Sequence, residues 1–258
     1  MALIIGGHFR SGTTLTTTLC NQHPEICLTY EFRSFSALNT TLSRYLRRLR
    51  KNWYSRGIVR QSSHQTPWWT RLSSGWFVAN YTLRLLPFAG HPIGVTEIEQ
   101  VLHQLFPHAR FVGDKTPHYV FELDALTREP DLKRIILYRD GRDVTSSMLT
   151  AIRGVWKGRR MAQMFDSVEK IAHSWVRSIE AMEKHQKDVY CLRYEDLARH
   201  PRATLDALAK WLEVDPAGFR DDLVRDTSIG KYRTGLTAAE LDVVEGVAGP
   251  TLARLNYR

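Results

Sequence analysis

The sequence predicts a single α/β domain, in which helices cover both faces of a mostly parallel central sheet. Two observations lead to this fold class. Short apolar runs alternate with longer stretches of helical pattern, and strands separated by helices favour parallel pairing. The length of 258 residues suits one large domain, and we find no repeat, low-complexity segment or linker that would divide residues 1–258.

The first expected elements are a buried strand, a glycine-rich turn and a helix. The apolar run at residues 2–5 predicts the strand, and residues 13–21 predict the helix, with Ser11 as its cap. Backbone N–H groups in such a turn and at the start of the following helix point to one place and form an anion site.

This turn nearly matches the phosphate-binding motif G-x-x-x-x-G-K-[ST]. Gly7 and Gly12 have the required spacing and Thr14 occupies the Ser/Thr position, but Thr13 replaces the lysine. Arg10 supplies a cation from within the turn, and its planar guanidinium suits phosphate oxygens. We therefore expect a phosphate-binding loop that does not belong to an ordinary nucleoside triphosphatase. The alternative is a structural turn without a ligand.

The remaining elements continue the alternation of strands and helices. Further strands are expected at residues 26–29, 110–113, 134–138 and 189–193. Helices are expected at residues 33–50, 77–87, 94–106, 142–152, 161–186, 201–213 and 238–255, with an irregular segment at 52–76.

Charged or phosphate-binding side chains follow every expected strand. In open α/β sheets, ligands bind outside the carboxyl ends of the strands. The groups at these ends are Arg10, Glu31 with Arg33, Lys115 with His118, Arg139 with Ser147, and Arg193 with Tyr194. Each alone has an ordinary explanation as an ion pair or helix cap, but five such groups at one edge indicate a site.

Composition limits the partners and the compartment. The net charge of +9 and the pI near 9.6 favour acidic ligands or surfaces. Cys20, Cys27 and Cys191 are too few and too scattered for a disulfide framework or a zinc site. No apolar run approaches membrane-spanning length and no signal peptide is visible, so we expect a cytoplasmic protein with reduced thiols.

Two motifs resemble those of sulfotransferases that use 3′-phosphoadenosine-5′-phosphosulfate (PAPS). Arg10-Ser-Gly-Thr-Thr14 resembles the 5′-phosphosulfate loop, in the arginine form of tyrosylprotein and carbohydrate sulfotransferases. Tyr138-Arg-Asp-Gly-Arg-Asp-Val-Thr-Ser-Ser147 resembles the 3′-phosphate motif, in which an arginine is followed eight positions later by a serine. Segments 192–201 and 230–235 support the resemblance, which extends over residues 3–257 and implies the P-loop NTPase-like sulfotransferase fold.

The resemblance implies transfer of a sulfuryl group from PAPS to a hydroxyl acceptor by in-line displacement, with release of the nucleotide 3′,5′-bisphosphate PAP. It implies no metal. The donor-binding residues that it implies are Arg10, Ser11, Gly12, Thr13, Thr14, Arg139, Ser147, Tyr194, Lys231, Tyr232 and Arg233.

Three residues are candidates for the chemistry beside Arg10. Glu31, which follows Arg10 at the spacing of the tyrosylprotein enzymes, is the first choice for the base and is expected in a partly desolvated cleft. The alternative for Glu31 is a surface salt bridge to Arg33. His118 is the second choice, because Lys115-Thr116-Pro117 departs from the Lys-Thr-His triplet of cytosolic sulfotransferases. Lys115 is expected to stabilise the leaving oxygen.

The acceptor is a small-molecule, glycan or peptide hydroxyl, and residues 33–106 are expected to form a helical insertion on its side of the site. The basic cluster at residues 44–60, with its interspersed tryptophan and tyrosine residues, suits a lid for an anionic or aromatic acceptor, a membrane-surface patch or a solvated helix face. Two other functions stay open. A nucleotide or sugar kinase is disfavoured by Thr13, and nucleic-acid binding explains the charge but leaves both phosphate motifs unexplained.

Overall fold

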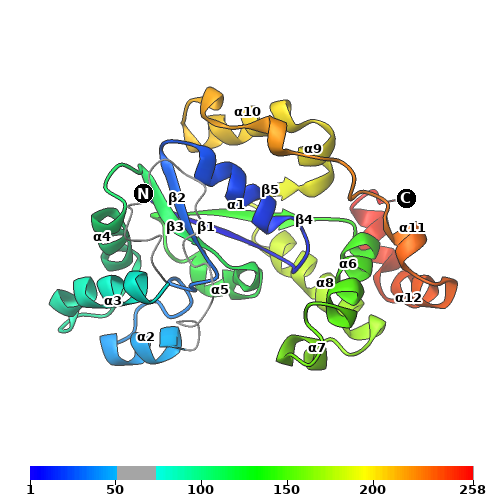
Figure 1. The fold of residues 1–258 in the computed structure, drawn as a ribbon, viewed down its shortest axis with the longest axis horizontal. Helices are drawn as coiled ribbons and strands as arrows, with labels where there is room; N and C mark the ends of the chain where they lie inside the picture. Colours follow the sequence, from blue (N-terminus) through cyan, green and yellow to red (C-terminus); the bar gives the residue numbers. More distant parts are fainter. Residues whose placement is uncertain (51–73, 258) are drawn as a thin grey trace.

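A five-stranded parallel sheet forms the centre of the computed structural model, which describes residues 1–50 and 74–257. The strands have the order β2-β3-β1-β4-β5 (Figure 1). They are β1 (Ala2–Gly7), β2 (Ile26–Tyr30), β3 (Phe111–Lys115), β4 (Leu132–Tyr138) and β5 (Tyr190–Arg193). The predicted fold class is therefore confirmed.

Successive side chains of β1 point to opposite faces of the sheet, as a strand requires. Leu3 and Ile5 pack in an apolar cluster with α1, α9 and α10. These helices, α1 (Thr13–Gln22), α9 (Tyr194–Arg199) and α10 (Pro201–Leu212), lie above the sheet in Figure 1. Ala2 and Ile4 pack in a second cluster on the other face. A strand buried on both sides explains why the run at 2–5 is continuously apolar.

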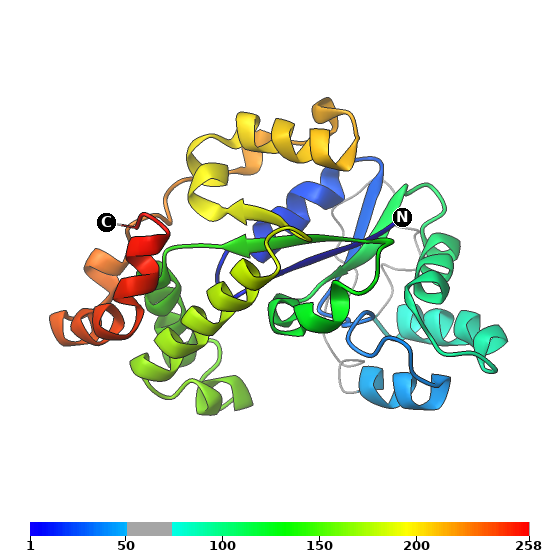
Figure 2. The same ribbon diagram turned by 180° about the vertical axis from the view of Figure 1, so that it is seen from behind.

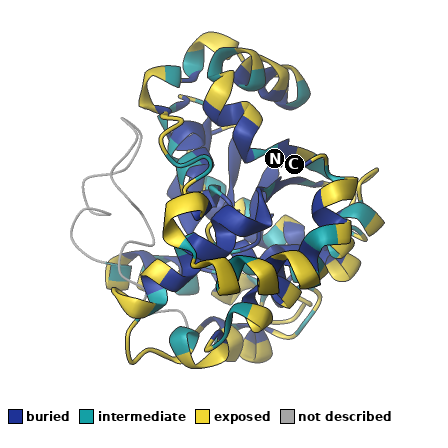
Figure 3. Ribbon diagram, turned by 90° about the vertical axis from the view of Figure 1, so that its right-hand side faces the viewer, coloured by how far each residue is buried: buried dark blue, intermediate teal, exposed yellow. Residues whose placement is uncertain are grey.

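The other face of the sheet carries two groups of helices (Figure 2). One group packs around β1 and β3, and the other packs around β4. The helices of this face and of the two ends of the sheet are α2 (Leu42–Leu49), α3 (Ser74–Leu85), α4 (Val95–Leu105), α5 (Leu123–Leu126), α6 (Gly141–Arg153), α7 (Arg160–Met164), α8 (Val168–Lys184), α11 (Tyr232–Gly235) and α12 (Ala238–Arg254). Figure 3 shows the buried sheet between helices whose outer surfaces are exposed.

Three local predictions are wrong. The helix expected at 33–50 is only α2, because Asp114 accepts the N–H groups of Phe32 and Arg33 and holds the preceding chain in turns. The helix expected at 161–186 is two helices, and Ser167 caps the second by accepting the N–H of Lys170. Ser11 does not cap α1, since Gly12 occupies that position without a side-chain bond.

Part of the expected irregular segment 52–76 lies outside the described residues, and so do Trp53, Trp68 and Trp69. Its last residues belong to α3, which begins at Ser74. The expectation that residues 33–106 form an acceptor-side insertion stays a prediction. Their described helices α2, α3 and α4 lie between β2 and β3 in the chain.

The strand register brings the carboxyl ends of the strands to one edge. Lys115 is the partner of both Ile5 and Tyr30, and Tyr138 is the partner of Arg193. The loops that follow β1, β2, β3 and β4 therefore begin beside one another, as a site at this edge requires. No helix in the described ranges has the length and apolar character needed to cross a membrane.

Candidate active site

The loop between β1 and α1 depends on glycine at two positions. Gly12 has a φ of 96°, and a Cβ atom there would collide with the ring of Tyr194. Gly7 has a φ of 144° and lies against the backbone of Leu137. Both the conformation and the close contacts exclude a side chain, so the spacing seen in the sequence has a structural cause. Tyr194 thus closes one side of the loop.

The two predicted phosphate motifs touch each other. Arg10 Nε donates a hydrogen bond to Ser147 Oγ at 2.9 Å, across 137 residues of sequence. Arg139 Nη1 donates to the carbonyl oxygen of Arg10 at 3.3 Å. Burial and the positive charge of Arg139 lower the pKa of Arg10. Because the guanidinium groups of Arg10 and Arg139 repel each other, an anion bound between them would be stabilised.

Arg139 is almost entirely enclosed, with 6% of its surface exposed. Its Nη2 lies 3.4 Å from Asp143 Oδ2, and its guanidinium lies 4.4 Å from the ring centre of Tyr194. Trp175 Nε1 donates to the carbonyl oxygen of Arg139 at 3.0 Å. The Nε of Arg139 is buried and has no hydrogen-bond partner among the described residues. One donor of a fixed guanidinium thus stays available for a ligand.

Asp143 is a residue that sequence reasoning missed. Its carboxylate accepts the N–H of Gly230 at 2.8 Å and the N–H of Tyr232 at 2.9 Å. Arg139 also donates to the carbonyl oxygen of Ser228, so the basic loop 230–235 is tied to the 3′-phosphate motif from both sides. The sequence feature that could have revealed this role is the position of Asp143 four residues after Arg139, a spacing at which opposite charges can pair.

The predicted residues of the loop 230–235 differ in their surroundings. Tyr232 is buried, and its ring centre lies 4.5 Å from the guanidinium carbon of Arg142. Lys231 and Arg233 are exposed. The structure therefore brings this segment, whose last four residues form α11, beside Asp143 and leaves the side chains of Lys231 and Arg233 exposed.

Lys115 connects the loop after β1 with the turn after β2. Its Nζ donates to Glu31 Oε1 at 2.8 Å and lies 3.4 Å from Thr14 Oγ1. Lys115 is 2% exposed, whereas the side chain of Glu31 is 55% exposed. Glu31 thus stays partly accessible to solvent while it lines a cavity, and its expected role as the base stays a prediction. The alternative pairing of Glu31 with Arg33 is wrong, because Arg33 pairs with Glu122 at 2.7 Å.

Asp114 holds the turn that carries Glu31, and sequence reasoning did not assign it this role. Its buried carboxylate accepts the N–H groups of Phe32 and Arg33 and the hydroxyl groups of Thr29, Thr116 and Tyr119. Burial raises the pKa of Asp114. Because its bonds span β2, β3 and the segment after β3, Asp114 sets the position of Glu31 relative to Lys115. The sequence feature that could have revealed this role is an acidic residue near the end of an expected buried strand.

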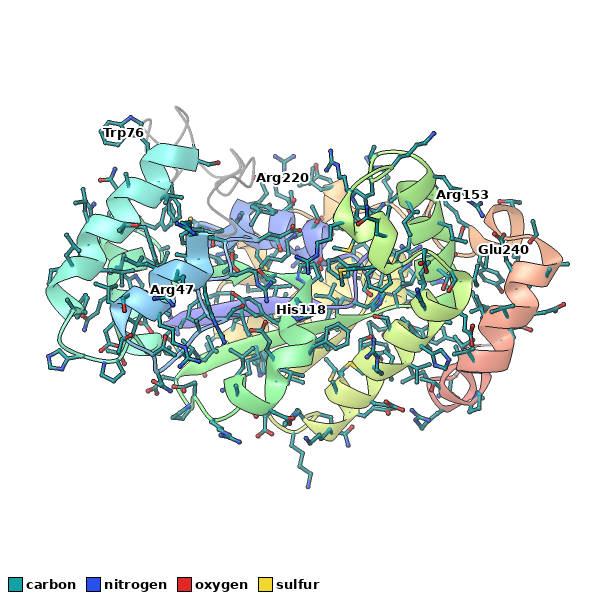
Figure 4. The ribbon with its side chains drawn as sticks, turned by 90° about the horizontal axis from the view of Figure 1, so that it is seen from below. Arg47, Trp76, His118, Arg153, Arg220 and Glu240 are labelled. Carbon is teal, nitrogen blue, oxygen red and sulfur yellow. The ribbon has the colours of Figure 1, made fainter. Side chains whose placement is uncertain are left out.

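His118, the second candidate base, follows β3 in the 3₁₀ helix η4 (Pro117–Glu122) and is labelled in Figure 4. Its side chain is 45% exposed and its Nε2 lies 3.9 Å from Glu122 Oε1. Burial and the charge of Arg33 lower its pKa. His118 and Glu31 line the same cavity of about 640 Å³, so both stay candidates for contact with an acceptor.

No cluster of three or more histidine, cysteine, aspartate or glutamate side chains suitable for a metal ion occurs within residues 1–50 and 74–257. Cys20 and Cys27 are buried, Cys191 is exposed, and all three are free. The candidate site therefore consists of arginine, lysine, hydroxyl and backbone donors on one side and Glu31 with His118 on the other.

The family model described as "Sulfotransferase family" matches residues 2–218, which include both phosphate motifs. The chain belongs to this family. No curated protein matches the sequence.

Solved structures of sulfotransferases share the fold at low sequence identity. A sulfotransferase domain from the curacin biosynthetic pathway superimposes with a TM-score of 0.63 at 15% identity, covering 100% of this chain and 98% of that one. A sulfotransferase domain from the Synechococcus PCC 7002 olefin synthase gives 0.62 at 18% identity, covering 96% and 94%. A mouse sulfotransferase complexed with PAP gives 0.51 at 11% identity, covering 98% and 84%. At these identities the likeness concerns the fold alone.

Proposed function

We propose that this sulfotransferase moves the sulfuryl group of PAPS to a hydroxyl acceptor and releases PAP. The observation that carries the proposal is the contact between the two phosphate motifs, in which Arg10, Ser147 and Arg139 converge at the carboxyl edge of the sheet. A donor with phosphates at both its 3′ and 5′ positions needs two adjacent anion sites, and the two motifs that meet at this edge supply cationic groups suited to both.

Two buried polar atoms support the fit of a bisphosphate donor. Ser11 Oγ and Arg139 Nε are enclosed and have no hydrogen-bond partner among the described residues. Buried donors are almost always satisfied, so two of them in adjacent motifs point to a missing acceptor. Phosphate oxygens are acceptors of this kind. We assign Arg139 and Ser147 to the 3′-phosphate, and Arg10 with the amides of residues 11–14 to the 5′-phosphosulfate.

Tyr194 and the segment 230–235 are the other proposed donor contacts at this edge. Tyr194 lies over Gly12 and Arg139, where it would pack against the nucleotide. The loop with Lys231, Tyr232 and Arg233 would close over the donor from the side of Asp143.

In the proposed step, the acceptor oxygen forms a bond to sulfur as the bond from sulfur to the bridging phosphate oxygen breaks. Glu31 takes the proton of the acceptor hydroxyl. The ammonium group of Lys115 balances the negative charge that develops on the leaving oxygen of PAP. Lys115 is suited to this role because it already reaches both Thr14 in the loop and Glu31. We propose that the reaction needs no metal ion.

Ligand-induced stabilisation tests the donor. PAP without metal should raise the melting temperature more than AMP or ATP does, because only PAP fills both anion sites. Stabilisation by ATP with Mg²⁺ and none by PAP would favour the kinase alternative and contradict the proposal. A screen of hydroxyl acceptors with radiolabelled PAPS then tests transfer itself.

A further inference from the structure

The cavity next to Glu31 has an apolar wall and a cationic wall. Its apolar side chains are Phe9, Phe121, Met161, Met164 and Phe165, and its cations are Arg33, Arg160 and Arg177. They come from the loop after β1, the turn after β2, the segment after β3, helix α7 with the residue that follows it, and helix α8. Of the described residues in the expected insertion 33–106, Arg33 alone lines this cavity.

The apolar wall is suited to a hydrophobic ligand. Phe9 and Phe165 meet edge to face with ring centres 6.2 Å apart. Met164, the last residue of α7, extends this wall and is 55% exposed. Methionine is flexible and polarisable, so it adapts to ligands of irregular shape. A cavity lined mainly by apolar side chains with a few charged groups is the usual form of a small-molecule site.

Two of the three arginines in the cationic wall have no counter-ion among the described residues. Arg33 is neutralised by Glu122. Arg160 and Arg177 are exposed and form no ion pair or hydrogen bond with any described residue. The one carboxylate among the residues that line the cavity is Glu31, which Lys115 already neutralises. An anion inside this cavity would therefore meet two uncompensated guanidinium groups.

The basic cluster that the sequence suggested for an anionic acceptor does not supply these charges. Its described arginines Arg44, Arg47, Arg48 and Arg50 are absent from the lining of the cavity, and residues 51–60 lie outside the described part of the chain. In Figure 4, Arg47 lies on α2, away from the segment that carries His118.

We infer that the acceptor is an alcohol with an apolar body and a carboxylate or similar anionic group. The body packs on the Phe9–Phe165 wall, the anion pairs with Arg160 and Arg177, and the hydroxyl lies at Glu31. This inference rests on the proposed function, since it names the substrate class of the same site.

Calorimetry on the full chain saturated with PAP tests the inference with two matched probes. The probes are ω-hydroxydodecanoate and its methyl ester, which share the chain and the hydroxyl but differ in charge. The carboxylate should bind about tenfold more tightly than the ester, the scale of one charge-assisted contact. Arg177→Gln and Arg160→Gln should each reduce this preference, and neither should change affinity for the ester or for PAP.

Arg202→Gln is the control for the loss of a guanidinium elsewhere, because Arg202 lies in α10 on the opposite face of the sheet and is absent from the lining of the cavity. It should leave the preference intact. Equal binding of the two probes, no binding of either, or loss of PAP affinity in Arg177→Gln would each overturn the inference. The last result would assign that cation to the donor instead.

Radiolabelled PAPS separates this inference from the proposed function. Carboxylate-selective binding without transfer to any hydroxyl would contradict sulfuryl transfer and leave the anion-binding cavity standing. Transfer to both probes with equal kcat/KM would support the proposed function and overturn the inferred acceptor class.

Discussion

The proposed donor side and the proposed acceptor side of the candidate site are built differently. On the donor side, Arg139 is enclosed by Tyr194, Asp143 and two backbone carbonyl groups, and its motif is linked to the loop of Arg10. On the acceptor side, Glu31 is half exposed and Arg160 lacks a partner among the described residues. The groups around Arg139 are held by one another, whereas the charges and the apolar surface beside Glu31 are open to a ligand.

This difference has an energetic reason. A buried guanidinium is costly unless its donors are satisfied, so Arg139 is stable only with several acceptors around it. Ordering these groups during folding reduces the entropy that binding must overcome. Exposed arginines such as Arg177 stay hydrated. They add to the binding free energy only when a negatively charged ligand pairs with them.

The largest expected effect comes from the acceptor side. Glu31→Gln should lower turnover by about 10²- to 10⁴-fold, because the amide cannot take the hydroxyl proton. Affinity for PAP should stay within about twofold, since Glu31 is not among the proposed donor contacts. Turnover with radiolabelled PAPS and calorimetry with PAP measure the two effects. Near-normal turnover would move the role of base to His118 or elsewhere.

The next effect concerns the donor side. Arg139→Ala should weaken PAP binding by about 2–3 kcal/mol, because a charge-assisted contact to the 3′-phosphate is lost. Arg139→Lys is the control, and it should bind PAP with intermediate affinity because lysine keeps the charge but not the planar fork. If calorimetry finds unchanged affinity in Arg139→Ala, the assignment of the 3′-phosphate is wrong.

A substitution of Asp143 tests whether its hydrogen bonds to the segment 230–235 contribute to PAP binding. Asp143→Asn should weaken PAP binding about tenfold, because an amide side chain accepts with one oxygen where the carboxylate accepts with two. Hydrogen exchange of the amides of Gly230 and Tyr232 should become faster. Unchanged exchange at both amides would show that the carboxylate does not hold this loop.

Ser147 gives a smaller effect within the same motif. Ser147→Ala removes one neutral hydroxyl and should weaken PAP binding by about 1 kcal/mol. Because Ser147 also accepts from Arg10, the double variant with Arg10→Ala should lose less than the sum of the two single effects. Strict additivity in calorimetry would contradict the coupling of the two motifs.

The smallest effect is expected at His118. If Glu31 is the base, His118→Gln should change turnover by less than about threefold, because the ring lies at the wall of the cavity and takes no proton in the proposed step. A loss of turnover as large as that of Glu31→Gln, with PAP affinity unchanged, would reverse the two assignments.

Much of the fold was predictable because its signals are local. The apolar run at 2–5, the spacing of Gly7 and Gly12, and the strand at 134–138 each depend on neighbours in sequence. The family of the chain followed from motifs of the same local kind. The turns at 33–41 were not predictable, since their helix-like composition is overridden by Asp114, which lies more than 70 residues away.

The sequence alone determined the parallel α/β fold, the phosphate loop and the identity of the residues at the strand ends. Only the tertiary structure decided which of them meet: Arg10 with Ser147, Lys115 with Glu31, and Asp143 with the loop at 230–235. The physical reason is the distance along the chain over which each interaction acts. Periodicity and turn chemistry act over a few residues, whereas these polar contacts form between side chains that only the packed sheet brings together.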